Sequence, residues 1–283
     1  MIKSISSEKS YGIKARLVDY SQLVKLRLTF TVVLSAVLGY LIAVKTGINM
    51  SAIIALTIGG FLVVGSANGI NQIIEKDFDS KMVRTENRPL ATNRMSVLEA
   101  AIFCSVLGII GVYILATRLN HLSAILGLCS LISYAFIYTP LKRYSSFAVF
   151  VGAFPGAIPP LLGWTAATGE IGIGGLTLFA LQFIWQFPHF WAIAWILDDD
   201  YKRAGYYLLP SPEGRNKKSA FLAATYTFAL IPISLIPFFI HISGIISTIV
   251  IVLCGIALFI QAVKLYRSCN LKDARKLMFY SII

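Results

Sequence analysis

The chain has 283 residues, of which 57% are hydrophobic and only 13% are charged, whereas a soluble globular domain is about 25% charged. Its mean hydropathy is +0.75. This composition excludes a disordered chain, a disulfide-stapled scaffold and an ordinary soluble enzyme. It predicts an all-α, polytopic membrane bundle, because helices satisfy their own backbone groups in lipid.

The net charge of +12 comes from basic residues that are spread along the sequence, so we expect no nucleic-acid partner. The first 21 residues form a polar tail, and we expect no cleaved signal peptide. The four cysteines have no metal-ligand spacing, and we interpret them as reduced, small apolar residues.

Apolar segments long enough to cross a bilayer, about 20 residues each, follow one another along the whole sequence. A further apolar segment, 277–283, resembles the start of a ninth helix that is cut short by the end of the chain. We therefore expect a single integral-membrane domain over residues 1–283. The eight complete spans are predicted at 24–44, 51–74, 97–117, 122–139, 146–166, 173–197, 219–239 and 242–263.

The distribution of Lys and Arg supports this topology. Alternate connections, together with the N-terminal tail, carry 23 of the 25 Lys and Arg residues, and only Lys45 and Arg118 lie on the other side. By the positive-inside rule, the N-terminus and the loops 75–95 and 198–218 are predicted to lie on the cytoplasmic side of the cell's inner membrane.

Two acidic clusters close apolar spans on that predicted side. In the first, Asn68, Asn71, Glu75 and Asp79 fall within an arc of about 80° on one helix face, whereas Asp77 lies opposite. Carboxylates at membrane depth need a partner or a cation, and oxygen donors of this kind suit Mg²⁺ bound to substrate phosphates. The alternative is a helix end that is polar only because it faces water.

Basic residues follow each acidic cluster. Arg84 and Arg88 come after the first, and Lys202 and Arg203 come after Asp198-Asp199-Asp200. Cations of this kind hold anionic oxygens, so the combination predicts a metal–diphosphate site. Taken alone, the arginines are ordinary positive-inside residues and the three aspartates a solvated turn.

Two further segments carry polar side chains. The loop Tyr138-Thr-Pro-Leu-Lys142-Arg143 offers a lysine that could stabilise charge on a leaving oxygen. The sixth predicted span carries Gln182, Gln186 and His189 on one face among aromatic residues. Such side chains can simply bond across helices, or they can contact a large planar ligand.

The pattern Asn71-xxx-Glu75-xxx-Asp79 followed by Arg84-Thr-x-x-Arg88-Pro resembles the first motif of the UbiA-type intramembrane prenyltransferases. Over about residues 22–283, the sequence resembles the haem-farnesylating branch of this superfamily. The stretches that carry this second likeness are Asn71–Leu90, Tyr138–Arg143, Gly152–Trp164, Gln186-Phe-Pro-His-Phe-Trp191 and Asp200-Tyr-Lys-Arg-Ala-Gly205.

The resemblance implies eight or nine helices and transfer of a farnesyl group from farnesyl diphosphate to a vinyl group of haem B, with water addition and Mg²⁺, giving haem O. It also implies a haem A synthase as partner. The chain departs from the family at its second motif, commonly Asp-x-x-x-Asp, where Ile196 takes the first position and Asp198 or Asp199 could compensate.

The expected site follows from these motifs. Catalysis is assigned to Asn71, Glu75, Asp79, Lys142 and Asp200, and Mg²⁺ binding to Asn71, Glu75, Asp79, Asp199 and Asp200. Substrate binding is assigned to Asn68, Arg84, Arg88, Tyr138, Arg143, Gln186, His189, Tyr201 and Lys202. Two other functions stay open: prenyl transfer to another aromatic or quinone-precursor acceptor, and carriage of isoprenoid diphosphates across the membrane.

Overall fold

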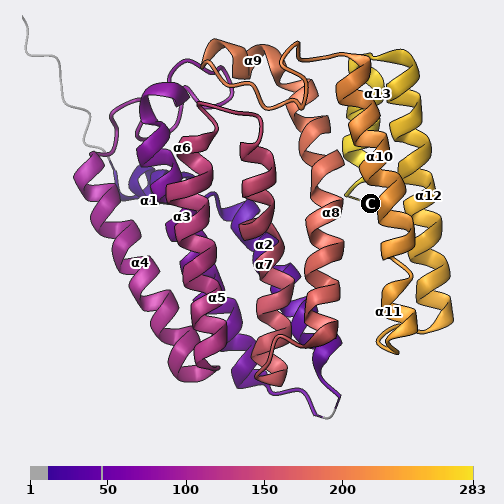
Figure 1. The fold of residues 1–283 in the computed structure, drawn as a ribbon. Coiled ribbons are helices and arrows are strands. Elements are labelled where there is room, and N and C mark those ends of the chain that lie inside the picture. Colours follow the sequence, from indigo (N-terminus) through magenta and orange to yellow (C-terminus); the bar gives the residue numbers. More distant parts are fainter. Residues whose placement is uncertain (1–11, 46, 283) are drawn as a thin grey trace, which may run out of the picture.

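The computed structural model describes residues 12–45 and 47–282. Within these residues the chain is built from helices (Figure 1). The long helices of the first half are α2 (Leu26–Ala43), α3 (Met50–Asp79), α4 (Val97–Arg118), α5 (His121–Ile132) and α7 (Ala148–Thr168). Those of the second half are α8 (Gly172–Ile196), α10 (Lys217–Ile233) and α12 (Ile245–Ser268). The shorter ones are α1 (Ile13–Leu23), α6 (Thr139–Leu141), α9 (Asp198–Arg203), α11 (Ile236–Phe239) and α13 (Leu271–Tyr280).

Seven helical segments of the described chain are long and apolar enough to cross a membrane, which confirms a polytopic membrane bundle. They are Leu26–Ala43, Met50–Asp79, Val97–Arg118, His121–Leu141, Ala148–Thr168, Lys217–Phe239 and Ile245–Ser268. The predicted span 173–197 is the 25-residue helix α8, which is not among the seven. Helix α8 carries Gln182, Gln186 and His189 among its aromatic residues.

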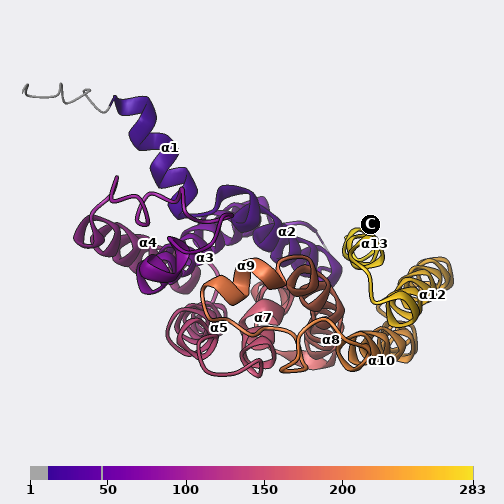
Figure 2. The same cartoon turned by 90° about the horizontal axis from the view of Figure 1, so that it is seen from above.

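The long helices stand side by side, and each packs on its neighbours around the bundle (Figures 1 and 2). Helix α3 packs on α2 and α4, α2 on α7, and α7 on α8. The chain then continues through α10, α12 and α13, and α13 returns to pack on α8. Helix α9 lies across the end of the bundle that also carries the end of α3 and the start of α2 (Figure 2).

The helix bounds differ from the predicted spans where polar residues continue a helix. Helix α3 extends to Asp79, five residues beyond the predicted span 51–74, because its polar stripe remains helical and buried. Helix α13 begins at Leu271, before the apolar stretch, because its first turns are amphipathic. Helix α1 lies within the predicted polar tail, of which residues 1–11 fall outside the described part; Ile283 also falls outside it.

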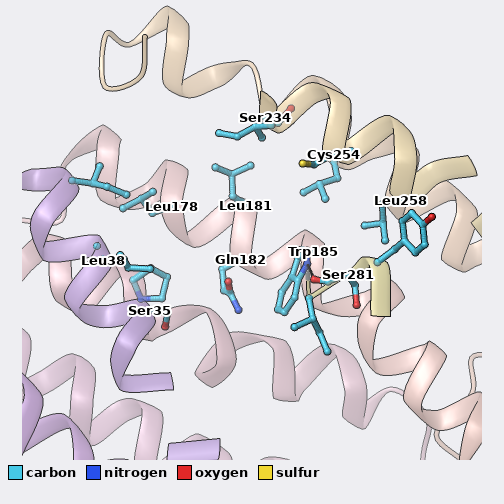
Figure 3. A pocket seen from close by; sticks show the side chains of 18 residues that line it. Ser35, Leu38, Leu178, Leu181, Gln182, Trp185, Ser234, Cys254, Leu258 and Ser281 are labelled. Carbon is cyan, nitrogen blue, oxygen red and sulfur yellow. Dashed lines mark hydrogen bonds between the residues drawn. The ribbon is translucent and has the colours of Figure 1, made fainter. Parts of the chain in front are cut away.

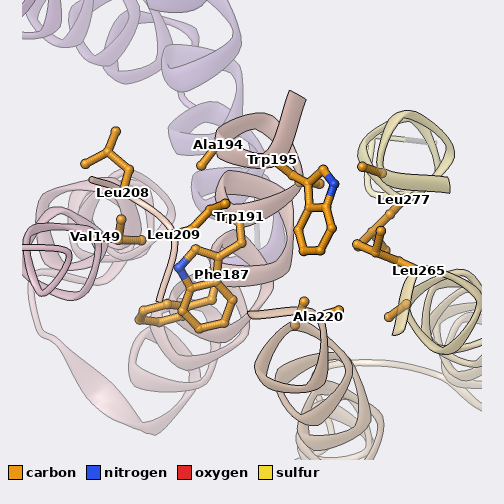
Figure 4. Close-up of a cluster of buried hydrophobic side chains, with 14 of the residues drawn as sticks. Val149, Phe187, Trp191, Ala194, Trp195, Leu208, Leu209, Ala220, Leu265 and Leu277 are labelled. Atoms are coloured by element: carbon orange, nitrogen blue, oxygen red, sulfur yellow. The ribbon is translucent and has the colours of Figure 1, made fainter. Parts of the chain in front are cut away.

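The largest buried cluster joins α8 to the C-terminal helices (Figure 4). Phe187, Trp191 and Trp195 of α8 pack with residues of α10, α12 and α13. Trp195 is 1% exposed, and Leu265 and Leu277 close the cluster on the far side. This packing fixes the C-terminal end of α8, where the second acidic cluster begins.

Helices α2 and α7 approach closely at glycine positions. A Cβ atom on Gly163 would overlap the carbonyl oxygen of Ala36, and one on Gly39 would overlap that of Pro160. Small residues allow such close backbone approach between membrane helices. The contact holds α2 against the bundle and so fixes the start of α2 at the site.

We expect Gly163→Ala to destabilise the bundle by about 3 kcal/mol, because neither backbone can move without disturbing the packing. Gly60→Ala is the matched control, since its Cβ would meet only Val33, at 3.7 Å. Thermal unfolding in detergent measures both variants. An equal midpoint for Gly163→Ala and the wild type would contradict the close approach.

Candidate functional site

The buried polar face of α3 is as predicted. Asn71, Glu75 and Asp79 are 1%, 4% and 1% exposed, whereas Asp77 on the opposite face is exposed. Asn71 Nδ2 donates to Glu75 Oε2 at 2.9 Å and to Thr139 Oγ1 at 3.0 Å. Asn68 lies one turn deeper and donates to Thr29 Oγ1 at 3.1 Å. The carboxamide and the first carboxylate therefore form one hydrogen-bonded unit inside the bundle.

Asn71, Glu75 and Asp79 each meet a cation from another segment of the chain. The cations come from the start of α2, from the loop after α3, and from the residues after α6, so the cluster ties together segments that are distant in sequence. The pairs are Lys25 Nζ with Asn71 Oδ1 at 2.9 Å, Arg88 Nη1 with Asp79 Oδ2 at 2.7 Å, and Lys142 Nζ with Glu75 Oε1.

Lys25 is a member of the cluster that sequence analysis did not identify. It precedes α2 and has a left-handed backbone, with φ 50° and ψ 59°. Desolvation, and then the nearby Arg88 and Lys142 cations, lower the pKa of Lys25 to about 7. The geometry brings three cations, Lys25, Arg88 and Lys142, to only two carboxylates, Glu75 and Asp79, and this imbalance favours an anionic ligand.

Lys142 is positioned by an irregular helix. A π-helical turn, Ser133–Tyr138, leads into α6, and Lys142 follows it. The Lys142 ammonium lies 4.8 Å from the Tyr138 ring centroid and 5.9 Å from that of Tyr206. The Tyr206 hydroxyl donates to Glu75 Oε1 at 3.3 Å, and burial raises the pKa of Tyr206. Tyr206 therefore remains a neutral donor beside the carboxylate.

Arg143, the next residue, serves the backbone of α3. Its Nη2 donates to the carbonyl oxygen of Ile74 at 2.6 Å, and its guanidinium lies 4.2 Å from the Phe78 ring centroid. These contacts hold the end of α3 against the loop that carries Lys142.

One carboxylate oxygen of the site lacks a partner. Asp79 Oδ1 is buried without a hydrogen bond, although Asp79 Oδ2 pairs with Arg88. A buried carboxylate oxygen without a hydrogen bond could coordinate a metal cation. No group of three Asp, Glu, His or Cys side chains that could hold a metal ion occurs among the described residues. Carboxamide and substrate oxygens would therefore have to complete the coordination of Mg²⁺.

The second acidic cluster opens α9 and uses its three aspartates differently. Asp198 is buried and pairs with Lys202 at 2.7 Å, whereas Asp199 is exposed and pairs with Arg215 at 3.0 Å. Arg215 Nε also donates to the carbonyl oxygen of Trp195, at 2.7 Å, and so caps the end of α8. Tyr201 is half-buried against the α8 cluster.

Asp200 joins the two acidic clusters. Its carboxylate accepts from the backbone N–H of Val83 at 2.8 Å and from that of Arg84 at 3.3 Å. The loops after α3 and α8 therefore adjoin at one end of the bundle, which confirms that they share a side. Arg84 itself is exposed, and its backbone is held in place by this contact.

We expect Asp200→Ala to speed hydrogen exchange at the Val83 and Arg84 amides by about tenfold, because both lose their acceptor. Asp77→Ala, an exposed aspartate on the outer face of α3, is the control. Mass spectrometry of peptides from the loop measures the exchange. Unchanged exchange in Asp200→Ala would show that another contact holds this loop.

The polar residues of α8 face its neighbours. Gln186 Nε2 donates to the carbonyl oxygen of Ala153 in α7 at 2.8 Å. His189 Nδ1 lies 2.7 Å from Ser281 Oγ, and Trp185 Nε1 donates to the Ser281 carbonyl oxygen at 2.9 Å. These contacts hold the residues after α13 against the middle of α8, and they place His189 toward the C-terminal helices rather than toward Asp79.

An apolar cavity of about 440 Å³ lies between α2, α8 and the C-terminal helices (Figure 3). Leu178, Leu181, Gln182 and Trp185 of α8 face it, with Cys254 on the opposite wall (Figure 3). Its wall is aliphatic and aromatic, and Gln182 and serine side chains are its polar members. Such a space suits a hydrocarbon or a planar apolar ligand.

Sequence reasoning missed the residues that act through tertiary contacts. Lys25 and Arg215 read as positive-inside residues, and Thr139 and Tyr206 have no distinguishing spacing. No local pattern places them beside Asn71, Asp199 or Glu75. The one available signal was the position of Lys25 inside the predicted apolar span 24–44, where a charged side chain needs a partner.

Comparisons with known proteins identify the family of this chain. The model of the UbiA prenyltransferase family matches residues 32–283. The chain is 47% identical to a protoheme IX farnesyltransferase of Cytophaga hutchinsonii, over 93% of this chain and 92% of the relative. It is 44% identical to the protein of that name in Flavobacterium johnsoniae, over 98% of this chain and 94% of the relative.

Solved structures share the fold at low identity. A UbiA homologue from Archaeoglobus fulgidus, bound to GPP and Mg²⁺, superposes with a TM-score of 0.73 at 13% identity over 93% of this chain and 98% of that one. A digeranylgeranylglyceryl phosphate synthase superposes with a TM-score of 0.78 at 21% identity over 94% and 93%. The sequence match, the shared fold and the buried motif together show that this chain is a membrane-embedded prenyltransferase of the UbiA family, similar in sequence to protoheme IX farnesyltransferases.

Proposed function

We propose that this chain transfers a farnesyl group from farnesyl diphosphate to a vinyl group of haem B and adds water, giving haem O and diphosphate. The observation that carries the proposal is the cluster in which Asn71, Glu75 and Asp79 each meet a cation at one end of an apolar bundle. The protoheme IX farnesyltransferases to which the chain is 44–47% identical supply the substrate pair.

The cations of the site bind the diphosphate. Arg84 and Arg88 lie in the loop after α3, Lys202 lies in α9, and Lys142 follows α6; together they neutralise phosphate oxygens. The allylic C–O bond then breaks, and its electron pair leaves with the diphosphate. Lys142, fixed between aromatic rings, stabilises the charge that develops on the leaving oxygen.

The residues assigned to Mg²⁺ are Asn71, Glu75, Asp79, Asp199 and Asp200, of which Asp79 offers a free, buried oxygen. When bound, the ion supplies positive charge to the phosphate oxygens. The A. fulgidus homologue, which shares this fold, was solved with GPP and Mg²⁺, and this supports Mg²⁺ as the ion. Exposed Asp199 is held outward by Arg215, so it must turn inward to take part.

The apolar wall of the bundle keeps water from the allylic cation until the acceptor attacks. The vinyl group of haem forms the new C–C bond, water adds to the resulting cation, and a proton is released. No side-chain nucleophile is needed. The residues proposed to shape the substrate sites around this reaction are Asn68, Tyr138, Arg143, Gln186, His189 and Tyr201.

The same proposal extends to topology. Helix α8 is the sixth membrane span and brings their number to eight, with its polar side chains turned to α7 and to Ser281. Helix α13 takes the place of a ninth helix between α8 and α12. Residues 1–283 form one domain, with the active site and the N-terminus on the cytoplasmic side of the inner membrane, and a haem A synthase receives the product. The excess of Lys and Arg in the site-side loops supports this orientation.

An acceptor comparison tests the proposed function. Membranes that contain the chain are incubated with farnesyl diphosphate and Mg²⁺, with haem B or with a small aromatic acid, and released diphosphate is measured. We expect diphosphate to be released when haem B is the acceptor and not when the aromatic acid is. Release with only the aromatic acid would move the reaction to another acceptor, and binding without any release would indicate a carrier.

A further inference from the structure

Lys25 has a backbone conformation that is unfavourable for lysine. It follows the last residues of α1, where its N–H donates to the Gln22 carbonyl oxygen at 3.2 Å, and it immediately precedes α2. At φ 50° it lies in the left-handed region, which glycine most often fills after a helix. A lysine at this position is explained by its side chain rather than by the turn.

The side chain reaches the centre of the site. Lys25 Nζ lies 2.9 Å from Asn71 Oδ1. The other end of that carboxamide, Nδ2, donates to Glu75 and Thr139, which fixes the orientation of the amide. Asn71 Oδ1 must therefore face Lys25, and the lysine occupies the oxygen that could otherwise coordinate a metal cation.

The charge of Lys25 also differs from that of its neighbours. Arg88 pairs with the carboxylate of Asp79 and Lys142 with that of Glu75. Across residues 12–45 and 47–282, no carboxylate lies within ion-pair distance of the Lys25 ammonium, which meets a neutral carboxamide instead. A half-buried ammonium with a neutral partner, beside two further cations, is a binding group for an anion.

We propose that Lys25 is a diphosphate-binding residue, and this rests on the proposed function. On binding, its ammonium leaves Asn71 Oδ1 for the phosphate oxygens of the isoprenoid substrate. The exchange frees the Asn71 oxygen at the moment the substrate arrives. Lys25 thus holds the Asn71 carboxamide in place before the substrate binds. It frees the Asn71 oxygen when the diphosphate arrives.

Lys25→Gly tests the role of the side chain without adding backbone strain, because glycine favours the left-handed conformation and lacks the ammonium. We expect an unchanged or higher thermal midpoint in detergent. We also expect the affinity for inorganic diphosphate with Mg²⁺ to fall by about 10- to 100-fold, as for loss of one charged hydrogen bond, and KM for farnesyl diphosphate to rise similarly.

Three further variants control this test. Lys25→Arg keeps a cation and should restore most of the affinity, and Lys25→Asn, which also tolerates a left-handed backbone, should behave like the glycine variant. Lys45→Gly removes an exposed lysine at the other end of α2 and should leave both constants unchanged.

Binding of inorganic diphosphate decides the proposal independently of turnover. Wild-type affinity in Lys25→Gly and Lys25→Asn would overturn it, as would a loss of kcat with unchanged binding. If the wild type binds diphosphate but does not farnesylate haem, the proposed function fails. The comparison of Lys25 variants in binding then still supports or overturns the role of the lysine.

Discussion

Asp79→Asn is expected to lower kcat for farnesyl transfer by about a thousandfold or more, with the protein still inserted in the membrane. Asp79 lies at the end of the buried stripe of α3, where Oδ2 pairs with Arg88 and Oδ1 is free. Asparagine keeps the shape but removes the negative charge that would hold a cation. Losing one preorganised electrostatic contact costs roughly 10²- to 10³-fold in rate, and here the misplacement of Arg88 adds to that loss.

Asp77→Asn is the matched control for this variant. It removes the same charge from the same helix, two residues away, on the exposed face. We expect it to retain wild-type activity. Circular dichroism and the thermal midpoint in detergent check that both variants remain folded. Full activity in Asp79→Asn would contradict the metal assignment, and equal loss in Asp77→Asn would indicate a general charge effect.

Lys142→Met is expected to have the next largest effect, and on both activity and stability. Its ammonium pairs with Glu75, a residue that is 4% exposed, so removing it leaves a buried carboxylate without its ion-pair partner. Breaking a buried ion pair in this way costs about 3–5 kcal/mol. We expect kcat to fall by at least about a hundredfold, because charge on the leaving oxygen loses its stabilising cation.

A double variant separates the two effects of Lys142. Lys142→Met with Glu75→Gln removes both charges, so the free energy of unfolding should recover most of the loss, whereas activity should stay low. Lys81→Met, an exposed lysine beside Phe78, is the control and should be active. Since Glu75 is itself assigned to the site, recovery of activity together with stability would show that the Lys142–Glu75 pair serves the fold rather than the reaction.

The sequence predicted most of the bundle because the apolar spans and the alternation of basic loops are local patterns. It also placed Asn71, Glu75 and Asp79 on one face, since helical spacing alone decides that. It did not predict α1, because this short helix is polar on average and has no apolar run that separates it from the rest of the N-terminal tail. It did predict α8, as the span 173–197, although this helix is not among the seven segments that are apolar enough to count as spans.

The candidate site was predicted in its residue types more than in its contacts. Nothing in the sequence pairs Lys25 with Asn71 or Asp200 with the amides of Val83 and Arg84, because these contacts join segments that are far apart in the chain. The aspartates of the second cluster read as equivalent neighbours. In the structure their surroundings differ, and only tertiary packing makes Asp198 buried and Asp199 exposed.

The most direct test of the account is the mass of haem after incubation with this chain, farnesyl diphosphate and Mg²⁺. We expect haem B to gain the mass of one farnesyl group plus water, and we expect the gain to disappear without Mg²⁺ or with Asp79→Asn. Unchanged haem from folded, membrane-inserted protein that binds farnesyl diphosphate would contradict haem O synthesis by this site.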